Sequence, residues 1–231
     1  MVENGYQEEP IKKSNLINSI TSTHNISYEK FAPPLRLAVL ASGKGSNLEA
    51  IIKAIRQRKL YAEVVILIVN NENCNARVIA SEHGIKCIYT DHRNFTDRIS
   101  YDQNLVDILK RTDIDGIVMA GWMRIVSPLF IEAFPNRLIN VHPSLLPSFK
   151  GSNAIKKALL SKAKITGCTI HKVIDEVDSG EIIAQAAVLI SEDDDENSLK
   201  EKIQFQEHKL LPIAISIIGN EWRKETTVEK K

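Results

Sequence analysis

The chain alternates short apolar runs with helical patterns, and this alternation limits the folds that it can adopt. Short apolar runs, typical of strands buried on both faces, occupy Leu35–Ser42, Ala62–Asn70, Lys86–Thr90, Gly116–Gly121 and Leu138–His142. Close alternation of such runs with helices is typical of βα units whose strands lie parallel. The sequence therefore predicts an α/β fold with a doubly wound, mostly parallel sheet.

The helices between these runs have recognisable ends. The helix expected over Asn75–His83 stops before a glycine, and Ser127-Pro128 opens a short helix with serine as N-cap and proline at the first helical position. Helical patterns also cover Leu48–Gln57 and Asp97–Arg111.

The C-terminal part has a different pattern. After a helix over Ala154–Lys162, two strands are expected at Ile165–Ile174 and Glu181–Ile190, joined by a polar loop. We expect this antiparallel strand pair to lie on the same sheet. The acidic run Ser191–Asn197 is expected to be solvated, and an amphipathic helix should cover Ser198–Gly219.

Length and composition fit a single globular domain. The 231 residues are 43% hydrophobic and 26% charged, which is enough to bury a core without disulfides or metals. We expect one domain over 35–220, with a nucleotide-type half at 35–140 and an appended half at 141–220. Residues 1–34 are expected to be a polar, disordered extension, and 221–231 a polar tail.

Charge and cysteine content favour small-molecule chemistry in a reducing compartment. A formal net charge of +1 gives no argument for nucleic acid or a membrane surface, and no stretch approaches the ~18 apolar residues of a membrane span. Three widely spaced cysteines form no disulfide framework. The cytoplasm is the expected location, and the oligomeric state is left open between monomer and homodimer.

Cys168 and His171 have the spacing of a metal pair, but no metal site is expected. Both lie in the alternating run Ile165–Ile174, where residues three apart point to opposite faces of a strand. We interpret both as packing positions.

The segment Ala41–Asn47 (ASGKGSN) joins the first strand to the first helix, and its glycines suit an anion-binding turn. A helix N-terminus offers N–H groups and a partial positive charge to a phosphate. The spacing is not that of a P-loop, and Leu48 stands where a dinucleotide fingerprint has its third glycine. Two interpretations stay open: a single phosphate held by Gly45, Ser46 and Asn47, or a ligand-free turn with a Ser/Asn helix cap.

Asn140 and His142 lie two apart at the carboxyl end of the fifth strand, so their side chains share one face. Open α/β sheets bind ligands at this end of their strands. An amide can donate to a developing oxyanion while an imidazole moves a proton, so the pair suits chemistry at a carbonyl; simple capping of the strand end is the alternative. If Asp178 approaches His142, its charge would raise the pKa of the imidazole. Ser144 lacks the Gly-x-Ser-x-Gly elbow of a serine nucleophile, so a substrate is expected to carry the nucleophile.

Several segments occur in the order found in a known family. They are Ser42–Asn47 (SGKGSN), Gly121–Ile125 (GWMRI), Asn140–Pro147 (NVHPSLLP), Asp175–Gly180 (DEVDSG) and Gln206–His208 (QEH). Together they resemble the phosphoribosylglycinamide formyltransferase family of folate-dependent enzymes. The resemblance implies a Rossmann-like formyltransferase fold, and transfer of the formyl group of 10-formyltetrahydrofolate to the amine of 5-phosphoribosylglycinamide in purine biosynthesis.

The resemblance also implies roles for the matching residues. Asn140 would hold the oxyanion, His142 would protonate the departing folate nitrogen or stabilise the tetrahedral intermediate, and Asp178 would keep His142 charged. The phosphate-bearing substrate would contact Gly45, Ser46, Asn47, Gln204, Gln206 and Glu207. The folate co-substrate would contact Arg98, Met123, Arg124, Ile125, Val126, Asn140, Ile174, Asp175, Glu176, Val177 and Asp178.

Other functions stay open at this point. Formyltetrahydrofolate deformylase, a hydrolase, has the same trio but carries a regulatory domain, which the 34 polar residues before the first strand are too few to form. Methionyl-tRNA formyltransferase needs a further C-terminal domain and nucleic-acid contacts. A non-catalytic nucleotide-binding module on the same sheet would leave the Asn–His–Asp set unexplained. Lys150 stands where many members of the resembled family have proline, so contacts there do not carry over.

Overall fold

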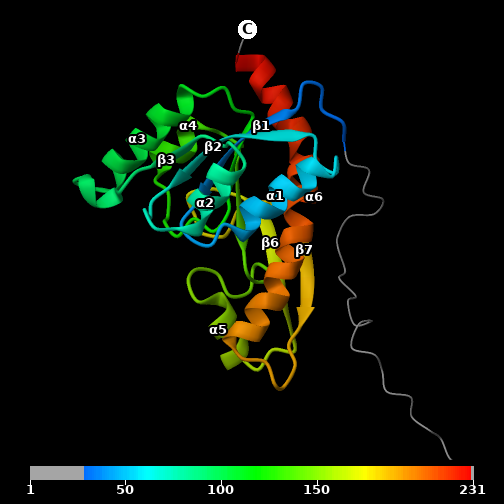
Figure 1. The fold of residues 1–231 in the computed structure, drawn as a ribbon. Helices are drawn as coiled ribbons and strands as arrows, with labels where there is room; N and C mark the ends of the chain where they lie inside the picture. The colour runs from blue at the N-terminus through cyan, green and yellow to red at the C-terminus, as the bar shows by residue number, and fades with distance from the viewer. Residues whose placement is uncertain (1–28, 230–231) are drawn as a thin grey trace, which may run out of the picture.

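The computed structural model describes residues 29–229, with side chains described up to Lys224. Within that range seven strands form one sheet, in the order β3-β2-β1-β4-β5-β6-β7 (Figure 1). The elements, in chain order, are β1 (Leu35–Ala41), α1 (Ser46–Arg56), β2 (Ala62–Val69), α2 (Asn75–Glu82), β3 (Cys87–Tyr89), the 3-10 helix η1 (His92–Asn94), α3 (Arg98–Lys110), β4 (Gly116–Met119), α4 (Pro128–Ala133), β5 (Leu138–His142), α5 (Ala154–Leu160), β6 (Ile165–Lys172), β7 (Ile182–Leu189) and α6 (Glu196–Glu229).

The sheet confirms the predicted mixed topology. Neighbouring strands from β3 to β5 run parallel, whereas β6 pairs antiparallel with both β5 and β7. The sheet continues without a break through β5, which belongs to both of the halves expected from the sequence. Most element ends differ from the predicted ones by one or two residues, because helix and strand ends fray.

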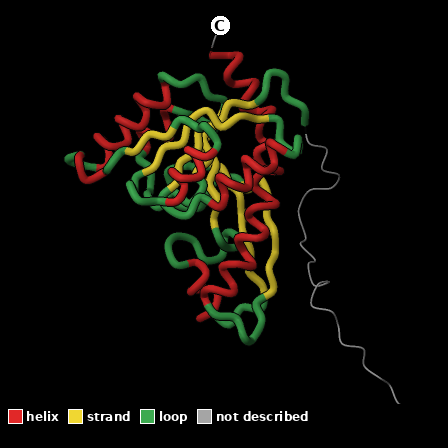
Figure 2. Tube along the Cα trace, in the orientation of Figure 1, coloured by secondary structure: helices red, strands yellow, loops and turns green. Residues whose placement is uncertain are grey.

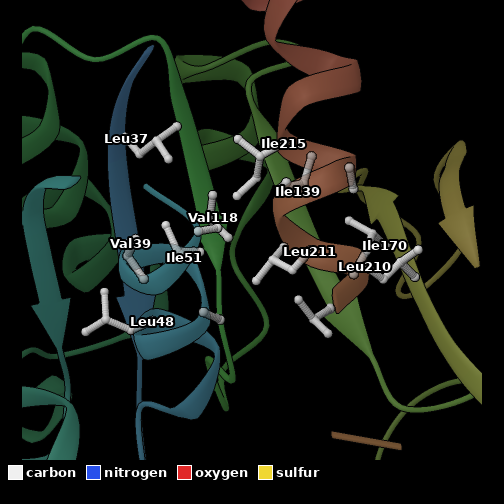
Figure 3. Close-up of a cluster of buried hydrophobic side chains, with 14 of the residues drawn as sticks. Leu37, Val39, Leu48, Ile51, Val118, Ile139, Ile170, Leu210, Leu211 and Ile215 are labelled. Carbon is white, nitrogen blue, oxygen red and sulfur yellow. The ribbon is translucent and has the colours of Figure 1, made fainter. Parts of the chain in front are cut away.

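Helices cover both faces of the sheet (Figure 2). On one face α1, α2 and α6 bury a large apolar cluster that includes Leu37, Leu48, Val118 and Leu211 (Figure 3). On the other face α3 and α4 bury a second cluster around Tyr101. Covering both faces explains why the parallel strands read as continuous apolar runs.

Helix α6 is longer than the sequence pattern predicts. It was expected to end near Gly219, but it continues through the residues interpreted as a polar tail to Glu229. Trp222 explains the extension because its ring is fully buried against the sheet, and its Nε1 donates to the Asn136 carbonyl at 3.0 Å. A Cβ on Gly116 would lie 2.4 Å from that ring, so β4 accommodates the indole only with glycine there.

Residues 29–34, which were expected to belong to a disordered extension, are ordered. Residues 1–28 lie outside the described part of the chain, but 29–34 pack along α6. Phe31 is buried in the larger apolar cluster, and the Glu29 amide donates to the Ser216 hydroxyl at 3.1 Å. Arg223 donates to the carbonyl of Pro33 at 2.8 Å. The buried ring of Phe31 therefore holds the otherwise polar segment that leads into β1 against the core.

The acidic run is not simply solvated. The Asp195 carboxylate accepts from the amides of Asn197 and Ser198 at 2.9 and 2.8 Å, which caps the N-terminus of α6. The Asp194 carboxylate lies 2.7 Å from the Nζ of Lys202, which is one helical turn beyond Ser198. These contacts fix where α6 begins. No helix in the described residues is long and apolar enough to span a membrane.

The buried indole gives a test of the fold. The substitution Trp222→Ala should lower the free energy of unfolding by about 3–5 kcal/mol, because it leaves a cavity and removes the hydrogen bond to the Asn136 carbonyl. Urea denaturation measures this change. Ile217→Ala removes a half-exposed apolar side chain of the same helix, so its expected cost is about 1 kcal/mol or less. Equal losses in the two variants would contradict the anchoring role of Trp222.

Candidate active site

A cavity of about 730 Å³ opens at the carboxyl ends of β4 and β5. Met119 at the end of β4 and Asn140 on β5 line this cavity, and the chain after β4 contributes Gly121–Val126. The start of α5 and the first turn of α6, with Asn197 and Lys200, form other parts of the lining. A volume of this size is in the range of pockets that enclose a drug-sized ligand.

Asn140, His142 and Asp178 come together at this cavity. The His142 Nδ1 lies 3.2 Å from an Asp178 oxygen, so the contact that the sequence could only suggest is present. The other ring nitrogen, Nε2, lies 3.0 Å from the Phe149 carbonyl oxygen. Asn140 is directly opposite His171 in the antiparallel register of β5 and β6, with its Nδ2 3.3 Å from the His171 Nε2.

The loop between β6 and β7 places Asp178. The backbone of Asp178 adopts a left-handed conformation with φ 52°, which aspartate tolerates better than most residues. Its carboxylate accepts from the Gly151 amide at 2.8 Å. Lys150 binds the same loop, with its Nζ 3.2 Å from Glu176 and 2.5 Å from the Ser179 hydroxyl. Lys150, at a position where many members of the resembled family have proline, therefore links two loops at the cavity.

Burial lowers the pKa of His142 below its ordinary value, although the Phe149 carbonyl and the Asp178 charge act in the opposite direction. The contact with Asp178 was predicted correctly, and the Asp178 charge acts to raise the pKa of the imidazole as expected. The net shift is nevertheless downward, because desolvation of the imidazolium outweighs the ion pair. Burial alone would raise the pKa of Asp178; the hydrogen bond from the Gly151 amide and the charge of His142 lower it instead. The aspartate is therefore the charged member of the pair.

The glycine loop forms the N-terminus of α1. Gly45 is the N-cap residue with φ 78°, and no side chain caps the helix, so the Ser/Asn cap considered from the sequence is not formed. A Cβ on Gly45 would lie 2.8 Å from the Ala76 Cα, so both conformation and space require glycine. The first amides of α1 therefore lie where a phosphate could meet them without a competing side-chain cap.

Asn47 and Glu207 join this loop to α6. The Asn47 Nδ2 donates to Glu207 at 2.9 Å, and the two side chains are only 7% and 6% exposed. Burial raises the pKa of Glu207, and the hydrogen bond from Asn47 partly offsets that effect. The Asn47 Oδ1 is buried with no partner in the described residues. A buried polar pair with an open hydrogen-bonding position suits a polar ligand.

The other predicted binding residues divide into two groups. Met123, Arg124, Ile125, Val126, Ile174, Asp175 and Val177 line the cavity. Arg98 is exposed at the start of α3 and Glu176 is exposed beside Lys150, both outside the lining, as are Gln204 and the buried Gln206 on α6. Met123 lines the cavity although its side chain is 80% exposed.

Sequence reasoning missed His171 as a site residue. It was interpreted as a packing position, yet it lines the cavity and approaches both Asn140 and Asp178. Only the strand register could have revealed this, because His171 and Asn140 are far apart in sequence. Cys168 does pack in the core, and no group of three or more metal-ligating side chains gathers within residues 29–229.

Comparison with known proteins places this geometry in a family. The family model described as formyl transferase matches residues 35–215. The trifunctional purine biosynthetic protein adenosine-3 of Homo sapiens is 36% identical over 220 residues, which are 91% of this chain and 22% of that protein. The same protein of Drosophila pseudoobscura pseudoobscura is 43% identical over 190 residues, 81% of this chain and 14% of that protein. The chain thus spans about a fifth or less of these relatives.

Solved structures match over most of their length. Glycinamide ribonucleotide transformylase 1 from Symbiobacterium toebii superposes with a TM-score of 0.80 and 35% identity, covering 84% of this chain and 93% of that one. Phosphoribosylglycinamide formyltransferase from Bacillus Halodurans gives a TM-score of 0.76 and 40% identity, covering 78% and 93%.

The His142–Asp178 contact gives a test that needs no substrate. Since the Asp178 charge raises the pKa of His142 against the effect of burial, Asp178→Asn should lower that pKa further. An NMR titration of the His142 ring measures the shift. Glu176→Gln removes an exposed carboxylate of the same loop that binds Lys150, so the His142 pKa should not change. An unmoved pKa in Asp178→Asn would contradict electrostatic coupling of the pair.

Proposed function

The chain belongs to the formyl transferase family, and we propose that it transfers the formyl group of 10-formyltetrahydrofolate to the amine of 5-phosphoribosylglycinamide. The products would be formylglycinamide ribonucleotide and tetrahydrofolate, in purine biosynthesis. One observation carries the proposal most directly: Asn140, His142 and Asp178 meet at one cavity at the carboxyl ends of the parallel strands. The relatives named above as formyltransferases share this fold.

The folate co-substrate fits the cavity chemically. The lining combines apolar side chains of Met123–Val126 and Ile174–Val177 with the polar groups of Asn140, His142 and Asp178. A flat heteroaromatic ring system with polar edges needs this mixture of surfaces. Arg124 lies over the Tyr101 ring, 5.1 Å from its centroid, which restrains a cation at the cavity wall. Arg98 and Glu176 stay proposed contacts for the outer part of the folate, although neither lines the cavity.

The ribonucleotide would bind between the glycine loop and α6. Gly45, Ser46 and Asn47 would hold the phosphate at the N-terminus of α1. Glu207, already bound to Asn47, would accept from ribose hydroxyls, with Gln204 and Gln206 on the same helix as further contacts.

Asn140 and His142 would act on the formyl carbon as the substrate amine attacks it. Asn140 would donate an N–H to the oxyanion that develops on the formyl oxygen. His142, whose pKa burial lowers, can accept the proton lost by the amine and deliver a proton to the departing folate nitrogen. Asp178 would stabilise the imidazolium as it forms and hold Nδ1. Nε2 is then the nitrogen left for the substrates, so its contact with the Phe149 carbonyl has to open during transfer.

Hydrolysis of the same co-substrate is the second candidate, because a deformylase would use the same trio with water as the nucleophile. The buried Asn47–Glu207 pair favours the transferase, since water as acceptor needs no such binding site. We further propose a cytoplasmic location, small-molecule substrates without nucleic acid, no metal, and a monomer or homodimer.

An assay with both substrates tests the function. Purified protein should remove the formyl group of 10-formyltetrahydrofolate only when glycinamide ribonucleotide is present. Loss without the ribonucleotide would indicate the deformylase, and no loss in either case would indicate a non-catalytic module. His142→Ala should lower kcat by about 10²–10⁴-fold, because a positioned acid–base group is lost. His83→Ala, a histidine outside the cavity lining, should leave kcat unchanged.

Glu207 gives a test of the ribonucleotide site. Glu207→Gln should lower kcat/KM for the ribonucleotide by about 10–100-fold, the equivalent of one charged hydrogen bond, with the KM for the folate unchanged. Steady-state kinetics with each substrate varied measures the two effects. Glu201→Gln changes an exposed acid of the same helix and should alter neither. A change of equal size in the KM for the folate would contradict the assignment of Glu207 to the ribonucleotide site.

The same variant has an expected pH signature. Because burial raises the pKa of Glu207, the folded state keeps its proton to higher pH than the unfolded state. The stability present below the ordinary glutamate pKa is therefore lost as pH rises through the folded pKa. Thermal unfolding of the substrate-free protein should show Glu207→Gln gaining in Tm over the unsubstituted protein as the pH rises above the ordinary glutamate pKa of ~4.3.

A further inference from the structure

His171 contacts two members of the trio, Asn140 and Asp178, and has no role in the chemistry proposed so far. The residue lies on β6 with a 3% exposed side chain, and it lines the cavity beside Asn140 and Asp178. A buried imidazole with three polar neighbours has a defined pattern of protons, because each neighbour requires a donor or an acceptor. That pattern decides how the side chains beside it are oriented.

The backbone determines one of the two ring nitrogens. The His171 Nδ1 lies 2.8 Å from the Lys172 carbonyl oxygen. A carbonyl oxygen only accepts, so Nδ1 carries a proton and donates it. In the neutral ring Nε2 then has a lone pair and no proton. Since strand geometry places the carbonyl, this tautomer is favoured by the fold and not by a mobile side chain.

The second nitrogen has two competing neighbours. The Asn140 Nδ2 lies 3.3 Å from Nε2, and an Asp178 oxygen lies 3.5 Å from it. An unprotonated Nε2 accepts from Asn140, whereas a protonated one donates to Asp178 and removes the acceptor from Asn140. Two observations favour Asn140 as the partner of Nε2. The amide is the nearer of the two groups, and Asp178 already accepts from the Gly151 amide and contacts His142.

We propose that His171, as the neutral Nδ1–H imidazole, is a positioning residue that orients the Asn140 amide. With one N–H of Asn140 held by His171, the second N–H faces the cavity, where the formyl oxygen would lie. Without an acceptor at Nε2 the amide can rotate by half a turn and present its oxygen to the oxyanion, which repels it. This inference rests on the formyl-transfer function and adds a determinant of its rate.

The tautomer can be measured without substrates. Long-range ¹H–¹⁵N correlation spectra of protein labelled at histidine, assigned with His171→Gln, report which ring nitrogens carry protons. We expect a protonated Nδ1 and an unprotonated Nε2 for His171. The reverse tautomer, or a ring protonated on both nitrogens near neutral pH, would overturn the proposal. Because this measurement requires no turnover, it decides the orientation even if formyl transfer is not the activity.

Two amide substitutions separate the nitrogens of the ring. The oxygen of a glutamine side chain can occupy the place of Nε2, while an asparagine side chain reaches only the place of Nδ1. His171→Gln should therefore keep kcat within about threefold, whereas His171→Asn should lower it by about 10–100-fold, less than the complete loss of an oxyanion donor. KM for both substrates should change by about twofold or less, since the oxyanion exists only in the transition state.

A double-mutant cycle distinguishes positioning from a general packing defect. If His171 acts through Asn140, His171→Asn should have little further effect on kcat in an Asn140→Ala background. Equal losses in both backgrounds, or an unchanged kcat in His171→Asn alone, would overturn the proposal. Inactivity of the unsubstituted protein would instead contradict the proposed function, and the spectra would still decide the tautomer.

Discussion

The structure around the cavity depends on how one buried carboxylate is satisfied. The Asp178 side chain is 9% exposed; the Gly151 amide donates to it, the His142 Nδ1 lies 3.2 Å from it, and the His171 ring packs beside it. A buried charge without such partners costs several kcal/mol, so the partners and the carboxylate stabilise one another's positions. The strained φ of Asp178 and the Lys150 contacts belong to the same arrangement, because they bring the β6–β7 loop back over β5.

That carboxylate also affects the protonation of His142. Burial makes a charged imidazole costly, and Asp178 reduces but does not remove this cost. In the proposed reaction, a lowered pKa would favour an imidazole able to take up a proton, and the Asp178 carboxylate beside Nδ1 would stabilise the imidazolium that forms. A ring held permanently as the imidazolium could donate a proton but could not first accept one.

The topology was predictable from sequence because the parallel strands are covered on both faces and read as apolar runs. The Asn140–His142 pair was also predictable, since strand periodicity places both on one face. Contacts between distant segments were not predictable from residue pattern alone. The His171 position depends on the β5–β6 register, and the direction of the His142 pKa shift depends on burial, which no spacing reveals. The end of α6 was missed because Trp222, one apolar residue in a polar tail, supplies its packing.

Helix α6 contacts both the cavity and the glycine loop, so the length of the helix between these contacts fixes how far apart the two proposed binding sites lie. Asn197 and Lys200 line the cavity, and Glu207 meets the glycine loop; with a rise of 1.5 Å per residue, Asn197 and Glu207 lie about 15 Å apart along one rigid axis. One residue added between them would lengthen that distance by only ~1.5 Å but turn Glu207 by about 100°, away from Asn47. The number of residues in this stretch is therefore constrained more tightly than their identities, and natural variation should take the form of substitutions and not of insertions.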